Sequence, residues 1–262
     1  MDIAVFTSCQ PRHLALLERL AAIADTVYAC IEVNTLFPGQ TDDFFKASDV
    51  MQSYFAQVQA AEVAEFGSHR FLPANVRVLP MKSGDLNGLD LASLKPALDS
   101  DLTVVFGSSY IKSPLIEPLV ERGAFNIHMG TSPYYRGSSC NFWALYDSNP
   151  GYVGATIHML SKGLDSGPML FHALPVFKTG ERLDGFALGM RAVQSAFNVM
   201  VELISSQRWK EVELVNQDRS LELRYSRNSD FTDTVASEYL NRVKDMSYSA
   251  EDIGNQSPFI LL

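Results

Sequence analysis

Three polar side chains with the right chemistry for acid–base catalysis lie in one stretch of the sequence. Asn126 and His128 are two residues apart and directly follow the apolar approach at residues 123–125. In an extended segment, residues i and i+2 point to the same face, so both side chains can enter one cleft from the end of a strand. Asp165 follows in a turn at residues 161–167. An amide, an imidazole and a carboxylate together can hold an oxyanion and move a proton.

Apolar patterns around these residues predict the elements that would position them. Continuous apolar runs are typical of strands buried in a parallel sheet, and apolar residues three and four apart are typical of amphipathic helices. The opening strand–turn–helix–strand order indicates a doubly wound α/β sheet, in which ligands bind beyond the carboxyl ends of the strands. We expect strands at residues 2–6, 26–33, 76–79, 102–106, 153–160, 170–176 and 221–226, and helices at residues 14–21, 48–67, 91–98, 183–204 and 233–243.

The turn after the first expected strand is a candidate binding segment. Polyanions often sit at this place in α/β folds, against the N-terminus of the following helix. Residues 7–13 contain no glycine, which argues against a Rossmann phosphate loop. Gln10 and Arg12 are therefore candidates for contacts to an acceptor substrate. The alternative interpretation is that Arg12 and His13 only solvate the start of the helix.

Composition and charge are typical of a globular protein and argue against tight binding to nucleic acid. The chain has 262 residues, 47% of them hydrophobic, which is enough for one large domain or one domain with an appendage. Its net charge is −9 and its isoelectric point about 5.0. Tight binding to nucleic acid draws on lysine and arginine contacts to phosphates, so an acidic chain is a poor candidate for it.

Cysteine usage and the lack of long apolar runs indicate the expected cellular location of the protein. The three cysteines, Cys9, Cys30 and Cys140, are isolated and form no CxxC pair, so we expect no metal site and a reduced, cytoplasmic environment. No apolar run approaches the roughly 20 residues of a membrane span. The N-terminus is typical of a strand leading into a helix rather than of a signal peptide.

Two motifs in this chain resemble signatures of enzymes that use 10-formyltetrahydrofolate. NIHMGTSPYYRG resembles the pattern N-x-H-P-S-L-L-P-x-Y-R-G, and VGATIHML with SKGLDSGPML resembles G-x-T-I-H followed by D-x-G. The chain departs from the first pattern at residues 129–132, where the family has Pro-Ser-Leu-Leu. The resemblance covers residues 100–175 and extends more weakly over 1–208. It implies a mainly parallel, Rossmann-like sheet of the formyltransferase type at residues 1–208, with a small C-terminal α/β appendage at 209–262.

The resemblance also implies a catalytic set and a folate-binding segment. It assigns catalysis to Asn126, His128 and Asp165, and it places residues 106–112 along the folate. His158, on the second signature, is interpreted as structural, and Cys140 as a packing residue rather than a nucleophile. The expected folate contacts are Phe106, Gly107, Ser108, Tyr110, Ile111, Gly130, Thr131, Ser132 and Pro133.

The implied reaction is direct formyl transfer from 10-formyltetrahydrofolate to a primary amine. Asn126 and a positively charged His128 would donate hydrogen bonds to the developing oxyanion, and losing one such donor typically costs about 3 kcal/mol of transition-state stabilisation. Asp165 would orient His128 and help carry the proton from the amine to the leaving nitrogen. This chemistry requires neither a metal ion nor a covalent intermediate.

Several acceptors are compatible with such a catalytic core. Methionyl-tRNA formyltransferases add a basic C-terminal domain, for which too few residues follow here, and glycinamide ribonucleotide formyltransferases carry a Gly/Ser/Asn loop after the first strand, which residues 7–13 do not match. The segment LRYSRNSDF resembles the tails of sugar N-formyltransferases, so we favour an amino sugar, free or nucleotide-linked. Another small amine, a formyltetrahydrofolate hydrolase and a non-catalytic folate-binding module are the alternatives. The expected partners are a small-molecule amine and, in a homodimer, a second copy of the chain, but neither nucleic acid nor a membrane.

Overall fold

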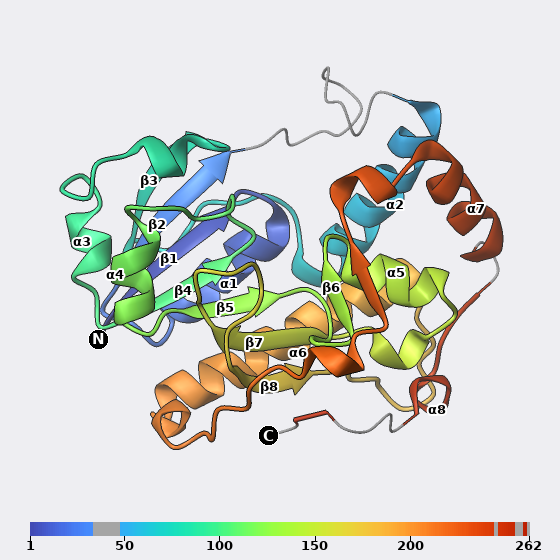
Figure 1. Cartoon of the computed structure of the whole chain (residues 1–262). Coiled ribbons are helices and arrows are strands. Elements are labelled where there is room, and N and C mark those ends of the chain that lie inside the picture. The colour runs from blue at the N-terminus through green and yellow to red at the C-terminus, as the bar shows by residue number, and fades with distance from the viewer. Residues whose placement is uncertain (34–47, 244–245, 255–258, 261–262) are drawn as a thin grey trace.

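A seven-stranded sheet forms the centre of the protein (Figure 1). The computed structural model describes residues 1–33, 48–243, 246–254 and 259–260. The strand order is β3-β2-β1-β4-β5-β7-β8, in which β1 to β5 are parallel, β7 runs antiparallel to β5, and β8 runs antiparallel to β7. The strands are β1 (Asp2–Ser8), β2 (Thr26–Val33), β3 (Val76–Lys82), β4 (Leu102–Phe106), β5 (Phe125–His128), β7 (Ala155–Met159) and β8 (Met169–Ala173). The predicted α/β fold with a mainly parallel sheet is confirmed.

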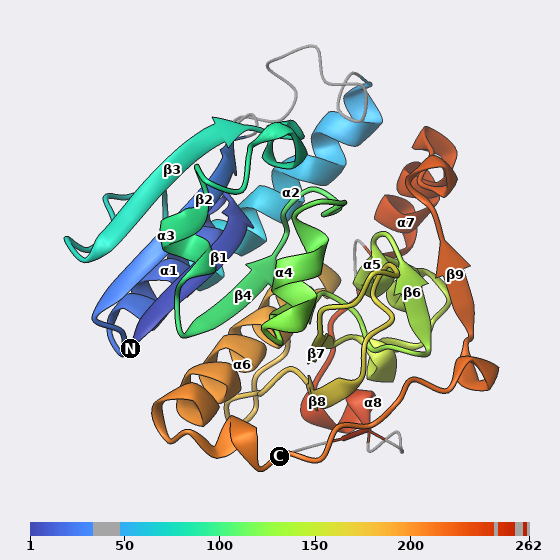
Figure 2. The ribbon, with the colours of Figure 1, turned by 60° about the vertical axis from the view of Figure 1, so that its left-hand side comes forward.

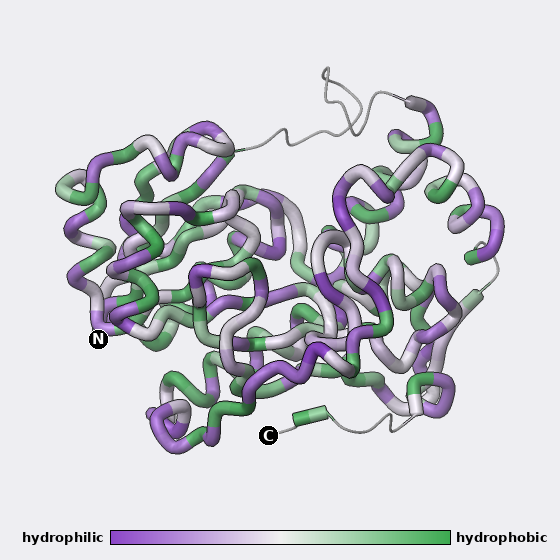
Figure 3. Tube along the Cα trace, viewed as in Figure 1, coloured by the Kyte–Doolittle hydropathy of each residue, from purple (hydrophilic) through white to green (hydrophobic). Residues whose placement is uncertain are grey.

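Helices cover both faces of this sheet, which explains why its central strands are apolar on both sides. Ile3 and Val5 face the core cluster that contains α1 and α6, whereas Ala4 and Phe6 face the cluster that contains α3 and α4. Figure 3 shows the hydrophobic central strands between these layers. The helices are α1 (Pro11–Ala21), α2 (Asp49–Phe66), α3 (Lys95–Leu98), α4 (Ile116–Glu121), α5 (Cys140–Tyr146), α6 (Gly185–Ser205), α7 (Asp233–Val243) and α8 (Ala250–Ile253).

The switch from parallel to antiparallel pairing occurs at β5, the strand that carries the two candidate catalytic residues. On one side β5 pairs with β4, and on the other it pairs with β7 in the opposite direction. The register with β7 sets Asn126 opposite His158 and His128 opposite Thr156. Directly opposed residues of an antiparallel pair project their side chains to the same face. The sheet therefore places an additional histidine beside Asn126.

The C-terminal residues pack on the same body rather than forming a separate layer. Strand β9 (Arg224–Ser226) pairs with β6 (Tyr135–Gly137), the next strand after β5 along the chain (Figure 2). Helix α7 packs against α2 (Figure 1), and both belong to a cluster rich in aromatic side chains around Tyr54. Gly137 has φ of 88°, and a Cβ on it would lie 1.9 Å from the backbone oxygen of Ser226. Only glycine permits this close approach of β9.

Several predicted elements are shorter in the structure than the apolar pattern indicates, including the strand expected at 153–160, which spans only Ala155–Met159. The helix expected at 91–98 begins only at Lys95, because Leu91 to Leu94 form turns. The strand expected at 170–176 ends at Ala173, and the strand expected at 221–226 spans only Arg224–Ser226. For the strands, tertiary pairing decides the boundary, and a local apolar pattern does not contain that information.

No helix in the described ranges is long and apolar enough to cross a membrane. Cys9, Cys30 and Cys140 are buried and unbridged. Within the same ranges, no group of three or more histidine, cysteine or acidic side chains is arranged to hold a metal ion.

Candidate active site

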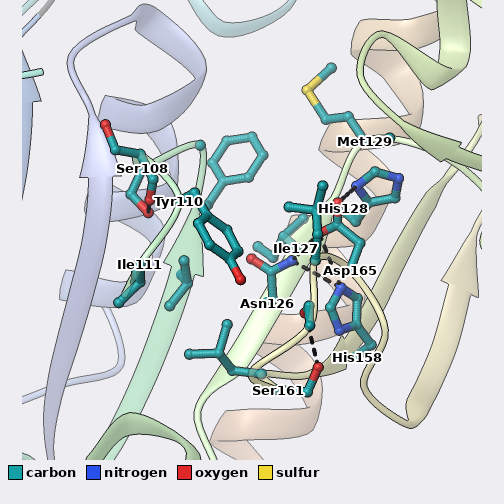
Figure 4. Close-up of a pocket in the computed structure, with 18 of the residues that line it drawn as sticks. Ser108, Tyr110, Ile111, Asn126, Ile127, His128, Met129, His158, Ser161 and Asp165 are labelled. Carbon is teal, nitrogen blue, oxygen red and sulfur yellow. Dashed lines mark hydrogen bonds and ion pairs between the residues drawn. The ribbon is translucent and has the colours of Figure 1, made fainter. Parts of the chain in front are cut away.

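The main cavity lies at the carboxyl end of the sheet and has a volume of about 310 Å³. Asn126, His128 and Asp165 line one wall, and residues 105–111 line the opposite wall (Figure 4). Ligands of open α/β sheets bind at this end, where the loops leave the strands. The structure therefore brings together the three polar residues that the spacing singles out.

Asp165 is the centre of the polar cluster. Its Oδ2 atom lies 3.3 Å from Nδ1 of His128, and its Oδ1 atom accepts a hydrogen bond of 3.2 Å from Nδ2 of Asn126. Nε2 of His158 lies 3.7 Å from the same Oδ1 atom. The carboxylate thus contacts the amide and both imidazoles from a single turn.

His158 fixes the orientation of the Asn126 amide. Its Nδ1 atom lies 2.9 Å from the backbone oxygen of Met159, which can only accept, so Nδ1 carries the proton. In the neutral ring, Nε2 is then an acceptor for Nδ2 of Asn126, at 2.9 Å. Both amide hydrogens of Asn126 are therefore directed to His158 and Asp165. Its amide oxygen points away from His158, toward the side where Tyr110 lies (Figure 4).

His128 presents only one of its ring nitrogens to the polar cluster. Nε2 is covered by Sγ of Cys140 at 3.4 Å, and a Cβ on Gly130 would lie 2.9 Å from it. Nδ1 faces Asp165. Burial raises the pKa of the Cys140 thiol, which therefore stays protonated and is no nucleophile. His128 therefore contacts the polar cluster through Nδ1 and Cys140 through Nε2.

Burial and charge act in opposite directions on the His128–Asp165 pair. Burial lowers the pKa of His128 below its usual 6.5, and the negative charge of Asp165 opposes this shift. Burial alone would raise the pKa of Asp165, but the adjacent His128 and His158 outweigh it and hold the pKa below its ordinary value. At neutral pH the resting pair is an ionised carboxylate beside a neutral imidazole, which is the state needed to accept a proton.

The buried histidines make a prediction about stability. Burial lowers the pKa values of His13, His128 and His172 in the folded state. Below pH 6.5 the unfolded chain takes up protons that the folded chain does not, so we expect stability to fall as pH falls through this range, by up to about 1.4 kcal/mol per pH unit for each histidine. Asp165 contributes only at lower pH, below the pKa of an unfolded aspartate.

Urea unfolding at pH 7.5, 6.5 and 5.5 measures this effect. A free energy of unfolding that is unchanged across this series would contradict the assignment of neutral, buried histidines.

The loop at residues 107–112 is held rigidly from outside the cavity. The buried Glu32 accepts hydrogen bonds from the backbone nitrogens of Ser109 and Gly84. Asn87 donates to the backbone oxygen of Tyr110 and accepts from the backbone nitrogen of Lys112, at 3.0 and 2.7 Å. This wall of the cavity is therefore preorganised by residues that do not line it.

The expected folate contacts separate into two groups. Five of them line the cavity, namely Phe106, Gly107, Ser108, Tyr110 and Ile111. The other four, Gly130, Thr131, Ser132 and Pro133, are not among the lining residues. Thr131 and Ser132 are fully buried, and they bond to Tyr152 and Thr156. These four residues are buried outside the lining of the cavity.

The first turn contains an ion pair instead of an open anion site. Glu62 of α2 is 2% exposed, and its Oε1 atom accepts from the backbone nitrogen of Arg12 at 3.0 Å and from the Arg12 guanidinium at 2.8 Å. A carboxylate thus occupies the positive N-terminus of α1 and neutralises Arg12. Arg12 lines the main cavity, whereas Gln10 lines a neighbouring pocket with Glu62.

Two residues of this region, Glu62 and Gln217, are not apparent from the sequence as parts of the site, and His158 is apparent only as a structural residue of the second signature. His158 lies in the cavity wall, and its place opposite Asn126 is set by strand register, which sequence order does not specify. Glu62 reaches the first turn from α2. Gln217 donates hydrogen bonds of 2.9 Å to the backbone oxygens of Asp165 and Gly167. Only the T-I-H motif around His158 gives a local signal.

Comparisons with known proteins identify the sequence family. The sequence model described as "Formyl transferase" matches residues 56–217. The methionyl-tRNA formyltransferase of Trichodesmium erythraeum is 28% identical over 160 residues, which are 60% of this chain and 43% of that protein. The chain therefore spans less than half the length of this curated relative.

Solved structures share the fold at low identity. A 4-N formyltransferase from Francisella tularensis superposes with a TM-score of 0.53 at 16% identity, over 88% of this chain and 77% of that one. The N-formyltransferase of Helicobacter canadensis, in complex with folinic acid and dTDP-3-aminofucose, has a TM-score of 0.52 at 15% identity, over 88% and 73%. With the family match covering more than half of its residues, the chain belongs to the formyl transferase family.

Proposed function

We propose that this protein transfers the formyl group of 10-formyltetrahydrofolate to the primary amine of a small molecule, with an amino sugar as the favoured acceptor. The observation that carries the proposal is the Asp165 carboxylate in contact with both His128 and Asn126, inside a cavity at the end of the sheet. Family membership supports the reaction class.

The cavity fits a flat, partly apolar donor. Its walls combine the apolar side chains of Phe106, Ile111 and Leu160 with the polar cluster at one end. Such a mixture of apolar walls and few convergent polar groups is usual for small-molecule sites. We assign the loop at 106–111 to contacts with the folate. When bound, 10-formyltetrahydrofolate would supply the activated formyl carbon.

The polar cluster can provide the proton transfers and the hydrogen-bond donor that formyl transfer requires. The reaction needs one proton removed from the amine and one returned to the departing nitrogen. Neutral His128 and the ionised Asp165 can together accept the first proton, and the Asp165 carboxylate beside Nδ1 stabilises the resulting imidazolium. The imidazolium is then a charged donor for the negative charge that develops on the formyl oxygen.

Asn126 has a more specific role than a free donor. In the structure its amide oxygen is the group not bonded to Asp165 or His158, so it can accept a hydrogen bond from the attacking amine. Donation to the formyl oxygen requires exchanging one of its two hydrogen bonds, and the bond to Asp165, at 3.2 Å, is the longer. We therefore infer that Asn126 releases Asp165 as negative charge develops.

Two observations favour a small acceptor without a phosphate at the first turn. Glu62 already fills the N-terminus of α1 and neutralises Arg12, which disfavours an anionic group there. The net charge of −9 disfavours a polynucleotide. The Helicobacter canadensis structure, with its bound dTDP-3-aminofucose, shows that the fold accommodates a sugar linked to a nucleotide.

A second candidate acceptor is methionyl-tRNA, because the curated relatives are methionyl-tRNA formyltransferases. The test offers both acceptors in parallel. Purified protein is incubated at physiological salt with 10-formyltetrahydrofolate and either a panel of free and nucleotide-linked amino sugars or methionyl-tRNA. We expect the mass of one formyl group on an amino sugar and none on the tRNA. Formylation of methionyl-tRNA alone would overturn the choice of acceptor.

Replacing Glu62 provides a prediction about the first turn. Glu62→Gln keeps the shape of the side chain but frees the charge of Arg12, so we expect inorganic phosphate to bind the variant at least about tenfold more tightly than the wild type. Isothermal titration calorimetry measures the binding. The double variant Arg12→Gln/Glu62→Gln is the matched control and should lose the added affinity. Equal phosphate affinity in wild type and Glu62→Gln would show that Glu62 does not block this position.

A further inference from the structure

We propose that the segment from Val215 to Ser226 completes the active site, with Gln217 as the residue that positions Asp165. This inference rests on the proposed function, because it assigns to Gln217 an effect on the catalytic carboxylate. Figure 1 shows the segment, in orange, running from beside β8, where Val215 pairs with Met169, to β9 next to β6. All but its first three residues lie beyond the 56–217 family match.

Gln217 holds the catalytic turn by both of its amide hydrogens. Its Nε2 atom donates to the backbone oxygen of Asp165 and to that of Gly167, each at 2.9 Å. These two carbonyl groups belong to the residue that carries the catalytic carboxylate and to one two positions later. A single planar amide therefore sets the direction from which the Asp165 side chain leaves the backbone.

The turn needs such support because its local conformation is unfavourable. Asp165 has φ of 43°, in the left-handed region, which costs a non-glycine residue about 1 kcal/mol or more. The neighbouring Leu164 is 47% exposed and adds little packing. A Cβ on Gly167 would lie 1.8 Å from the backbone oxygen of Met159, so the turn runs tightly against β7. Outside contacts must therefore stabilise this geometry.

A second contact from the same segment acts through Arg136. Glu222 binds Nη1 of Arg136 at 3.0 Å, and Nη2 of Arg136 contacts the backbone oxygen of Leu164 at 3.4 Å. Arg136 is buried, and it contributes positive charge near Asp165. The segment thus fixes the turn on both sides of the catalytic residue.

The segment itself is anchored before and after Gln217. On one side, Val215 exchanges two backbone hydrogen bonds with Met169 of β8, at 2.8 and 2.9 Å. On the other, Arg224 makes two hydrogen bonds of 2.8 Å to Asp147 and lies over the ring of Trp143. With both flanks fixed to the sheet and to α5, the Gln217 amide has a defined position.

The test replaces Gln217 with methionine, which keeps the length of the side chain and removes its donors. We expect kcat for formyl transfer to the best amino sugar of the panel to fall about tenfold, with the KM for 10-formyltetrahydrofolate changed less than twofold. In an Asp165→Asn background the same replacement should have no further effect on kcat, because the carboxylate it positions is gone. Arg242→Met is the matched control, since Arg242 also donates two hydrogen bonds from the C-terminal region, to Tyr146 and Ser148, without touching the turn.

A readout without substrate distinguishes positioning from general stability. Because Asp165 raises the pKa of His128, a displaced carboxylate lowers it. His128 also faces His158 and Arg136, which act in the opposite sense to Asp165. NMR titration of the His128 ring should therefore show a lower pKa in Gln217→Met than in wild type, and no change in Arg242→Met.

Specific results would overturn the proposal. A wild-type kcat and an unchanged His128 titration in Gln217→Met, with only a loss of stability, would make Gln217 a structural residue. An equal loss of kcat in the Asp165→Asn background would place its effect elsewhere. Failure of the proposed function is a different result, because then wild-type protein itself would form no formylated amine.

Discussion

His128→Ala is expected to lower kcat for formyl transfer by at least about a hundredfold while the fold remains intact. The substitution removes both the proton acceptor and the charged donor that the imidazolium becomes. The ring is buried between Asp165 and Cys140. Its loss leaves a small cavity and removes one of the contacts of the Asp165 carboxylate. Steady-state kinetics at saturating substrates measure the effect, and circular dichroism and tetrahydrofolate binding verify that the variant is folded.

His69→Ala is the matched control for this experiment. His69 is exposed and lies outside the main cavity, so its replacement should leave kcat unchanged. If His128→Ala retained the turnover of the wild type and only lost stability, His128 would be a packing residue and the proposed mechanism would be wrong.

Asp165→Asn is expected to have an effect of similar size and, in addition, to change the pH dependence. The carboxylate raises the pKa of His128 against the effect of burial. Its replacement by an amide therefore lowers that pKa further below 6.5. Since the neutral imidazole accepts the proton, the lower break in the pH–rate profile should lie below pH 6.5 in wild type and at still lower pH in the variant.

Rates measured from pH 5 to 8 for both proteins test this expectation. We expect the rate of Asp165→Asn to fall by on the order of a hundredfold or more at pH 7, because the amide cannot stabilise the imidazolium. A break that moves to higher pH, or a rate equal to that of the wild type, is incompatible with Asp165 acting through His128.

Local patterns predict the parts of the fold that depend on local physics. The strands at 26–33 and 102–106 and the helix at 233–243 agree with the structure to the residue, because continuous apolar runs and helical spacing are properties of the segment itself. The Ser48 cap and the Gly67 end of α2 are equally local signals, and both are present.

Contacts between distant segments are what such patterns omit. The three residues YRG of β6 read as loop, and they become a strand only because β9 pairs with them. Glu62 reaches Arg12 across 50 positions, and Gln217 reaches Asp165 across 52. The type of a residue such as Glu62 or Gln217 does not indicate which distant residue it contacts. These supporting residues can therefore be identified only from the folded structure.

The proposed catalytic residues and the histidine beside them come from several elements of the fold. The end of β5 provides the amide and the imidazole, the turn after β7 provides the carboxylate, and β7 itself provides the histidine that orients the amide. His128, Asp165 and His158 each have a further contact to a residue that does not line the cavity, namely Cys140, Gln217 and Met159. This arrangement limits the motion of the polar cluster, as preorganised electrostatic stabilisation requires.

Transfer of an isotopically labelled formyl group tests the central claim most directly. Wild-type protein is mixed with 10-formyltetrahydrofolate labelled with carbon-13 in the formyl group and with the panel of amino sugars, and the products are followed by mass spectrometry. We expect a labelled N-formyl product together with an equal amount of tetrahydrofolate, and no product with His128→Ala. Release of labelled formate without any formylated amine would identify a hydrolase, and the absence of any tetrahydrofolate would contradict catalysis at this site.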